Sequence, residues 1–498
     1  MTPAHKSRRA FVAFIALGSI CHTPIAMSQA SQPTPAKVSI VEDRFGRERQ
    51  LTSGPGGRIL TNTGVWSPDG QWIVYDTRSD PAGNVFDGEH IEMVHLTSRE
   101  VRRVYSSKNG AQCGVVTFHP TQPKVVCILG PENPTPGWSY GPSHRQGLIV
   151  DIQDFLRQPQ ADPASPWHFL DARNLTTPFT PGALRGGSHV HVWDAAGDWV
   201  SFTYEDHVLQ RFTQPGPDHD QNQRNVGVCV PVRAVRVPKT HPRNHDGQFF
   251  SVLVTKTTSS PRPGSDEIEK AFEEGWVGVN GYLRPDGSRQ RRALAFLGTV
   301  RDDRGETISE LFIADLPEDM TVVGTGPLEG TDLRMPAPPQ GVVQRRLTRT
   351  SDRKFPGTQG ARHWARSSPD GSQIAFLMKD DAGIAQLWTV SPNGGPSKQV
   401  SFNPWPVASA FSWSLDGLRI AHILDQSVCL TEVATRRTFR ITSRVEPERS
   451  PRPEACVISP QGTHIAFVRN VPSPGRPSNQ ICVVEVGADP WVKPQQKR

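Results

Sequence analysis

A four-residue turn that recurs along the chain constrains its fold more than any other feature. Residues 67–70 and 368–371 both read Ser-Pro-Asp-Gly, and an apolar run follows each of them, QWIVYD and QIAFLM. In this motif proline presets φ, aspartate bonds the nearby backbone, and glycine accepts a positive φ. A tight turn between two apolar runs is typical of an antiparallel β-hairpin.

Less similar copies of the turn occur along the chain, and the last three copies are evenly spaced. Three of them begin with Pro285, Ser414 and Ser459, and two degenerate copies begin with His119 and Asp194. The proline or its equivalent falls at positions 68, 120, 195, 285, 369, 415 and 460. The last three positions are 46 and 45 residues apart, which is the length of a four-stranded blade and the signature of a β-propeller.

The repeat therefore predicts an all-β protein, a single propeller of seven four-stranded blades. Six blades is the alternative, if the two degenerate copies belong to one irregular unit. Strings such as 345–348 (RRLT) and 439–442 (FRIT) end their blades and predict outermost strands, but the final unit lacks such a string. We predict that residues 47–53, which contain Leu51, supply the missing strand beside the unit that contains Phe467. This pairing would close the ring, since an exposed sheet edge is costly.

The repeats resemble those of TolB-type propellers, relatives of the WD repeat, in which SPDG is followed by IAF or IVY. Residues 60–76, 130–134, 185–194 and 359–371 are similar to an uncharacterised bacterial family that includes YidR. The resemblance extends over residues 45–486 and implies the propeller fold. It implies no reaction, because this family has no assigned activity.

The chain begins with a stretch typical of a Sec-type signal peptide. Lys6, Arg8 and Arg9 precede the apolar run AFVAFIALGSI, and Ser28-Gln29-Ala30 fits a cleavage site. This run is too short to cross a bilayer, which takes about 20 residues. We predict a signal peptide over 1–30, a loose leader over 31–44, a propeller over 45–490 and a basic tail over 491–498. The mature protein is expected to be periplasmic or secreted, without membrane insertion.

The net charge bears on which partners the protein can bind, and the cysteines bear on whether it contains disulfides. A net charge of +6 on 55 basic and 49 acidic residues is mild and gives no reason to expect nucleic-acid binding. We expect a monomer that binds an unknown protein, an anionic small molecule or an oligosaccharide. Six cysteines follow the signal peptide, and their spacing selects no disulfide pairing. They are expected to be small buried hydrophobic residues: Cys113, Cys127, Cys229, Cys429, Cys456 and Cys482.

The pair His189-x-His191 is the strongest candidate for a functional site. Residues two apart share one face of a strand, so both imidazoles could reach one metal ion. The repeat places the pair at the start of the innermost strand of the third blade. Arg362 with His363, and Glu454, take the corresponding places in the fifth and seventh blades.

The starts of the innermost strands should meet at one mouth of the central channel. His144 and Arg145, on the long loop of the second blade, are expected to overhang this mouth. Three interpretations remain open. The residues could be hydrogen-bonded packing or channel lining, they could bind an anionic ligand or peptide, or His189, His191 and His363 could hold a divalent metal.

Three other features have structural interpretations. Residues 137–141 match the G-x-S-x-G nucleophile elbow, but the elbow needs a strand before it and a helix after it, and prolines flank this copy. Residues 266–274 (DEIEKAFEE) are predicted to form one short helix with a capping pair. Tryptophans stand near several turns and are expected to be packing elements: Trp66, Trp193, Trp364 and Trp413.

The function predicted from these features is an exported ligand- or protein-binding propeller without a recognisable nucleophile. The alternative is an enzyme, a metal-dependent polysaccharide lyase of the oligogalacturonate type. A divalent metal held by channel histidines would acidify the α-proton of an acidic sugar and stabilise the enolate. Three imidazoles within about 5 Å of one another would favour the lyase, because nitrogen ligands lie at about 2.1 Å from such a metal.

Overall fold

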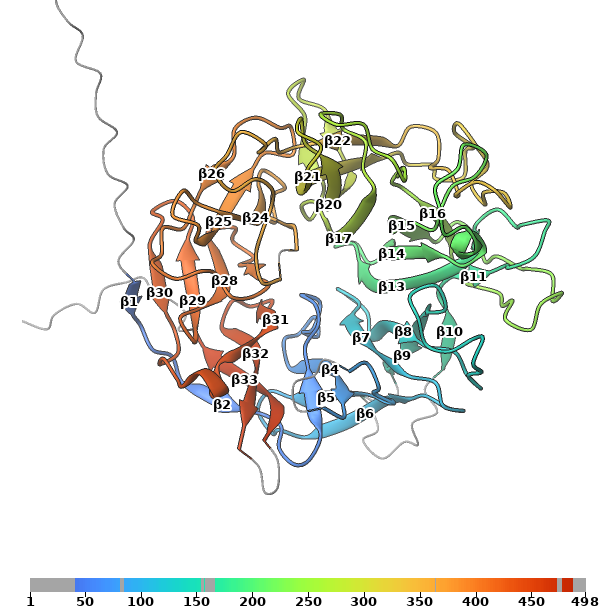
Figure 1. The fold of residues 1–498 in the computed structure, drawn as a ribbon. Helices are drawn as coiled ribbons and strands as arrows, with labels where there is room; N and C mark the ends of the chain where they lie inside the picture. Colours follow the sequence, from blue (N-terminus) through green and yellow to red (C-terminus); the bar gives the residue numbers. More distant parts are fainter. Residues whose placement is uncertain are drawn as a thin grey trace, which may run out of the picture. The chain divides into compact units, whose positions relative to one another are not determined.

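Seven β-sheets follow one another around a ring (Figure 1). The computed structural model describes residues 41–80, 85–153, 156, 166–362, 364–472 and 477–486. Each blade holds four antiparallel strands in chain order, and the last blade takes one of its four from the start of the chain. The sheet of the sixth blade has a fifth strand, also from the start of the chain. The prediction of a seven-bladed, all-β propeller is confirmed. Six blades is wrong, because each degenerate turn belongs to a blade of its own.

The strand bounds show the regular order of the blades, from the innermost strand outwards. The first two blades are β3 (Gly57–Ile59), β4 (Trp72–Arg78), β5 (His90–His95) and β6 (Val101–Ser106), then β7 (Cys113–Phe118), β8 (Lys124–Leu129), β9 (Gln146–Asp151) and β10 (Trp167–Phe169). The third and fourth are β13 (Gly186–Trp193), β14 (Val200–Asp206), β15 (Asn225–Val230) and β16 (Phe250–Leu253), then β17 (Lys270–Trp276), β20 (Arg292–Arg301), β21 (Thr307–Leu316) and β22 (Val343–Arg346).

The remaining blades repeat this order. The fifth and sixth are β23 (Arg366–Ser367), β24 (Ile374–Lys379), β25 (Ala385–Val390) and β26 (Lys398–Gln399), then β27 (Ser412–Trp413), β28 (Arg419–Leu424), β29 (Ser427–Glu432) and β30 (Thr438–Arg440). The seventh is β31 (Pro451–Ile458), β32 (His464–Val471), β33 (Ser478–Glu485) and β2 (Glu48–Gln50). Small two-stranded sheets lie outside the blades, β11 (Ala172–Arg173) with β12 (Ala183–Leu184) and β18 (Tyr282–Leu283) with β19 (Arg289–Gln290).

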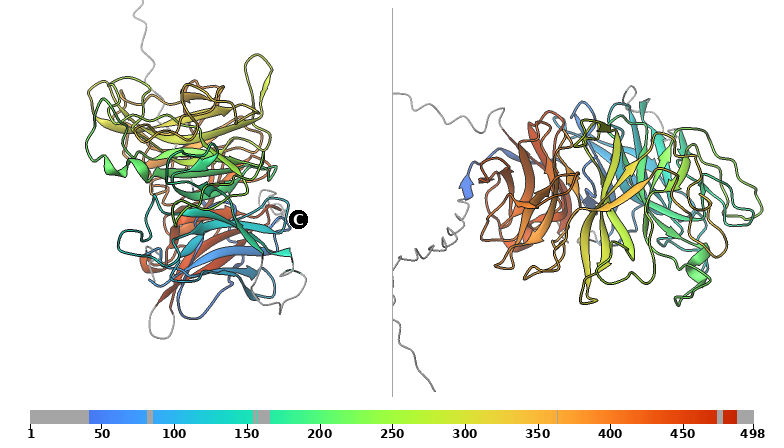
Figure 2. Two further views of the ribbon diagram at one scale, coloured as in Figure 1. Left: turned by 90° about the vertical axis from the view of Figure 1, so that its right-hand side faces the viewer. Right: turned by 90° about the horizontal axis from the view of Figure 1, so that it is seen from above.

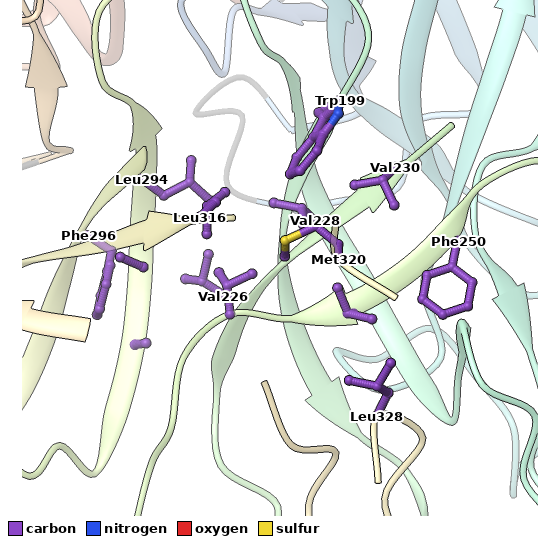
Figure 3. Close-up of a cluster of buried hydrophobic side chains, with 14 of the residues drawn as sticks. Trp199, Val226, Val228, Val230, Phe250, Leu294, Phe296, Leu316, Met320 and Leu328 are labelled. Atoms are coloured by element: carbon purple, nitrogen blue, oxygen red, sulfur yellow. The ribbon is translucent and has the colours of Figure 1, made fainter. Parts of the chain in front are cut away.

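The hydrophobic core lies between neighbouring blades. Middle strands such as β24 and β28 are buried on both faces, which explains their continuous apolar sequences. Between the third and fourth blades, Val228 and Phe250 pack in one cluster with Phe296 (Figure 3). Further views show these two blades side by side (Figure 2). Removal of apolar area from water, at about 25 cal/mol per Å², therefore stabilises the ring blade by blade.

The beginning of the chain closes the ring, as predicted. β2 pairs antiparallel with β33, in the same sheet as Phe467 on β32. The predicted leader is too long, however, because β1 (Val41–Asp43) pairs parallel to β30 of the sixth blade. An ion pair of 3.1 Å between Arg440 and Asp43 supports this pairing. The outer edge of β30 is thereby covered, which is the physical reason for the extra strand. The predicted signal peptide and tail lie outside the described residues.

The predicted helix over 266–274 is wrong. Residues 270–276 form β17, the innermost strand of the fourth blade, and pair with β20. Ala271 is fully buried in the core between blades. Ring geometry requires a strand at this point, and tertiary pairing overrides the helix propensity of a charged segment.

Two further expectations concern turns and cysteines. The turn at Pro285 lies on a separate hairpin, β18–β19, inserted between β17 and β20. All six cysteines after residue 30 are buried and free, as expected for small hydrophobic residues. Burial raises the pKa of the Cys113 thiol to about 12. No helix among the described residues is long and apolar enough to cross a membrane.

Candidate functional site

The innermost strands of three blades share a bulge that decides where their side chains point. Val115, Val190 and Glu273 have φ values of 53°, 59° and 56°, and each lies at a shift in register with the neighbouring strand. Positive φ is unusual for a residue other than glycine, above all for valine. A bulge inserts one residue and re-aims the side chains that follow it.

The expectation that His189 and His191 share one face of the strand is therefore wrong. His191 Nε2 lies 2.9 Å from Ser188 Oγ, which donates to Asp171 beside the second blade. His189 is paired with Thr203, whose hydroxyl donates to Glu274 of the fourth blade. Opposed residues of a ladder share a face, so the two imidazoles face different blades. The residue inserted at Val190 is the cause.

Burial keeps both imidazoles neutral. It lowers the pKa of His191 to about 3 and that of His189 well below its usual value. Within the part of the chain that the structure describes, His189 Nε2 and His191 Nδ1 have no hydrogen-bond partner. No cluster of three or more His, Cys, Asp or Glu residues in the described ranges could hold a metal ion. These two histidines thus offer neither a shared metal site nor a positive charge.

Of the other predicted residues, the structure brings Arg145 beside this pair. Arg362 is exposed, and His363 is outside the described residues. Glu454 is buried and forms an ion pair of 3.0 Å with Arg452. The carbonyl of Arg145 accepts a hydrogen bond of 3.2 Å from Ser188 N–H, so the loop of the second blade lies beside the start of β13. We call this end of the channel, where β13 begins, the entry mouth.

A cluster of rings fixes the loop at the entry mouth. Trp138 stacks on His144 with 3.8 Å between ring centroids, and His144 Nε2 lies 3.1 Å from His207 Nδ1. Burial lowers the pKa of both histidines, to about 4 for His207. A turn, not a helix, follows Tyr140. The G-x-S-x-G match therefore lies in a loop, as predicted, and forms no nucleophile elbow.

A cavity of about 450 Å³ lies at the opposite end of the innermost strands. We call this end, where β13 ends at Trp193, the exit mouth. The last residues of the innermost strands and the turns after them line the cavity, and all seven blades contribute. None of the predicted site residues that the structure describes lines it. Its wall includes Trp66, Pro68, Phe118, Pro120, Trp193, Trp276, Arg366, Pro369, Trp413 and Pro460.

Tryptophans join the blades around this cavity. The indole N–H of Trp66 donates to the carbonyl of Val457 at 3.1 Å, and that of Trp276 donates to Val192 at 2.9 Å. Trp413 donates to the carbonyl of Arg366 at 2.9 Å. Each bond runs to the innermost strand of the preceding blade. The prediction of packing tryptophans is confirmed, but the rings also give the cavity an aromatic wall.

Arg366 is the cation of the cavity wall. Burial lowers its pKa to about 10, so it stays charged at neutral pH. Its guanidinium lies 3.4 Å from the backbone oxygen of Glu274 and 3.4 Å from Asn62 Oδ1. The ion pairs between described residues do not include it, whereas Asp194 of the same wall is paired with Arg292 at 2.9 Å. Arg366 can therefore accept an anionic group from the cavity.

The carboxyl group of Glu274 interacts electrostatically with the Arg366 guanidinium. Burial raises the pKa of its carboxyl to about 7, against the opposing effects of the Thr203 hydrogen bond and of Arg366. The carboxyl is therefore partly protonated near neutral pH, and Arg366 interacts electrostatically with both Glu274 and Glu273.

The sequence held a signal for Arg366 that the search for histidines missed. Arg366 stands three residues before Pro369 of its turn. At the same distance from their turns, the first, third and seventh blades have Val65, Val192 and Val457. The other copies have Thr117, Tyr282 and Ser412 there. A charged residue at a position that is otherwise uncharged indicates a local function. Only an alignment of the repeats on their turns makes this visible.

Comparison with solved structures shows the fold. An oligogalacturonate lyase in complex with manganese is 10% identical, with a TM-score of 0.51 over 91% of this chain and 96% of that one. An oligogalacturonate lyase from Vibrio parahaemolyticus is 9% identical, with a TM-score of 0.54 over the same shares. TolB from Acinetobacter baumannii is 11% identical, with a TM-score of 0.33 over 87% of this chain and 79% of TolB. At these identities the similarity concerns architecture alone.

Comparison with protein sequences shows the family. A family model described as a protein of unknown function, DUF3748, matches residues 112–245, which span the second blade and most of the third. The uncharacterized protein YidR of Escherichia coli K12 is 44% identical over 424 residues, which is 84% of this chain and 94% of YidR. The match to YidR thus covers most of both chains. The chain belongs to the YidR family of β-propeller proteins.

Proposed function

We propose that this propeller binds an anionic ligand in the cavity of the exit mouth. The observation that carries the proposal is Arg366, a guanidinium on the cavity wall that forms no ion pair with another described residue. Guanidinium groups bind carboxylates through two parallel hydrogen bonds, which are stronger than neutral ones. The tryptophan wall offers flat apolar surface to the body of the ligand. The volume falls in the range of about 300–1,000 Å³ that is usual for small-molecule sites.

Matched pairs of charged and neutral probes test this proposal. Isothermal titration calorimetry would compare trigalacturonate with its methyl ester, and N-acetyl-trialanine with its C-terminal amide. Each charged probe is expected to bind at least about tenfold more tightly than its neutral partner, since a charge-assisted hydrogen bond contributes about 1.5–3 kcal/mol. Added salt should weaken the charged probe only.

The variant Arg366→Gln should abolish the preference for the charged probes. Arg304→Gln, an exposed residue away from the cavity, is the matched control and should bind like the wild type. Unchanged thermal unfolding would show that each variant is folded. The proposal is overturned if Arg366→Gln keeps the preference, or if no probe binds at a concentration of about 1 mM, which corresponds to about −4 kcal/mol.

We also propose that the protein acts outside the cytoplasm. The support is the sequence of residues 1–30, with its basic start, apolar run and small residues before the cleavage site. Cell fractionation of the tagged full chain, followed by N-terminal sequencing, tests this. The expected result is a periplasmic or secreted protein that begins at Ser31; an uncut chain in the cytoplasm would contradict it.

The lyase is the weaker alternative. The arrangement of His189 and His191 on faces toward different blades does not fit a shared metal ion, so no step through a metal is derived. Metal analysis of the purified protein, with and without His189→Ala, and absorbance of unsaturated products from trigalacturonate test it. Stoichiometric metal that is lost in the variant, together with product formation, would favour the lyase over the binding function.

A further inference from the structure

The cavity of the exit mouth is the middle of three adjoining hollows. A hollow of about 660 Å³ on the third to fifth blades shares Asp194, Trp276 and Pro369 with the cavity wall. A hollow of about 390 Å³ on the sixth and seventh blades shares Leu415, Ile458 and Pro460 with it. Neighbouring hollows share wall residues and therefore adjoin, and we call the three hollows together the groove of the exit mouth.

One end of the groove is basic. Three arginines line it, Arg289, Arg291 and Arg292, against two carboxylates. Of these carboxylates, Asp194 is paired with Arg292 and Asp370 accepts a hydrogen bond from Ser368. Arg291 lies 3.7 Å from Glu318 with both side chains largely exposed, a geometry that contributes little. Arg289 donates a hydrogen bond of 3.2 Å to the carbonyl of Asn280. Two guanidinium groups at this end are thus available to acidic groups of a ligand.

The fourth blade alone carries the hairpin that builds the basic end. Arg289 belongs to β19 of this hairpin, which interrupts the connection from β17 to β20. The hairpin is fixed, because the Tyr282 hydroxyl donates to Asp315 at 2.8 Å and the Arg345 guanidinium donates to Tyr282 at 2.7 Å. A rigid insertion thus holds the cation in place over the groove.

The other end of the groove is mainly apolar. Leu415, Ile458, Ile465 and Val486 line most of it, beside an ion pair of 3.7 Å between Arg419 and Asp416. The side chain of Leu415 is 65% exposed. An exposed leucine on a turn at the edge of a cavity contributes nothing to the core. It would gain from contact with an apolar group.

We infer that the groove binds an extended peptide segment with acidic residues at one end and an apolar residue at the other. The inference rests on the proposed ligand site at Arg366, which becomes the middle of the groove. A peptide can carry different side chains along its length, which matches a groove that is basic, then aromatic, then apolar. An acidic oligosaccharide repeats one charged unit and would leave a carboxylate against this mainly apolar end, where the guanidinium of Arg419 already faces Asp416 at 3.7 Å.

Selection from a random peptide library displayed on phage tests the inference. Immobilised wild-type protein is the target, and peptides of about ten residues suit the groove, since each extended residue adds about 3.3 Å. Enriched sequences should carry Asp or Glu toward one end and Leu, Ile or Phe toward the other. Failure to enrich any shared pattern would overturn the inference.

Variants at the two ends separate this inference from the proposed function. Fluorescence anisotropy would measure a selected peptide and a truncated form that keeps only its central residues. Arg289→Gln with Arg291→Gln, or Leu415→Asp, should weaken the full peptide by roughly tenfold and leave the truncated form unchanged. Arg366→Gln should weaken both forms, and Arg304→Gln neither.

Each remaining outcome has a definite meaning. If the end variants bind the full peptide like the wild type while Arg366→Gln weakens it, the groove inference fails and the central site stands. If Arg366→Gln also binds the full peptide like the wild type, both the groove inference and the proposed site at Arg366 fail. The substituted residues at the ends are exposed or partly exposed, and equal thermal unfolding of all variants would exclude a loss of fold.

Discussion

Both mouths of the channel contain buried polar side chains, but these side chains have different roles at the two mouths. At the entry mouth, His189 and His191 are buried and neutral, and their bulged strand directs them to different neighbours. At the exit mouth the turns after the innermost strands leave a cavity, and Arg366 keeps its charge there. The difference teaches that the chemical type of a residue does not reveal a site. A polar side chain between blades holds the ring together, whereas the same kind of side chain on the cavity wall can meet a ligand.

The most damaging change to the entry mouth should be the loss of Arg185. Its side chain is 1% exposed, its Nε lies 2.7 Å from Asp206 Oδ2, and it also donates to the carbonyl of Arg334 at 2.7 Å. Arg185→Ala leaves a buried carboxylate without its partner, which costs about 3–5 kcal/mol. Urea unfolding should show this loss. The double variant Arg185→Met, Asp206→Leu should recover much of it, and a silent Arg185→Ala would refute the structural role assigned to this mouth.

The second largest effect at the entry mouth should be a loss of folding stability in acid. Burial lowers the pKa of His191 and of His245 to about 3 each, below the unfolded value of 6.5. The unfolded chain then binds more protons, so this stability is complete above pH 6.5 and is lost as the pH falls toward 3. At pH 5 each such histidine should cost about 2 kcal/mol. Urea unfolding between pH 7 and pH 5 measures how the free energy of unfolding changes with pH. His191→Gln should reduce this pH dependence; an unchanged dependence would show that His191 is not buried in its neutral form.

A rise in pH should lower the free energy of unfolding through a carboxyl group near Arg366. The pKa of the Glu274 carboxyl is raised by burial to about 7 from 4.5. The folded state therefore binds the extra proton, and the stability present below pH 4.5 is lost as the pH rises through 7. Glu274→Gln should gain about 2 kcal/mol relative to the wild type on going from pH 5 to pH 8. Thermal or urea unfolding at both values checks this, and an equal difference at both would show that Glu274 does not titrate in this range.

The sequence alone predicted the features that repeat. The turns, the blade count and the closure by residues 47–53 depend on local signals that recur in every unit, so a degenerate copy is supported by its neighbours. Cysteine burial followed from the same strands. These features are determined by hydrogen bonding and apolar burial, and both require the same residue types at the same position of each repeat.

Features that occur once were missed. The positive φ of Val190 has no local signal, because valine disfavours it and the ring imposes it. Residues 266–274 have a helical composition, but the ring requires a strand there. Arg366 was overlooked because the search followed residue types suited to metals rather than departures from the repeat. The candidate site at the exit mouth therefore came from the structure, although Trp66, Trp193 and Trp413 of its wall were named from the sequence.

The smallest effect should distinguish two tryptophans of the exit mouth. Trp66 donates its indole N–H to Val457, whereas Trp193 Nε1 is buried without a partner among the described residues. Both side chains are buried, at 5% and 8% exposed. Substitution by phenylalanine removes a similar apolar area in each case, so the difference between the variants isolates the hydrogen bond. Trp66→Phe should lose about 1 kcal/mol more than Trp193→Phe in urea unfolding. Equal losses would mean that apolar packing alone joins the blades at this mouth, and that the carbonyl of Val457 is satisfied by solvent in the cavity.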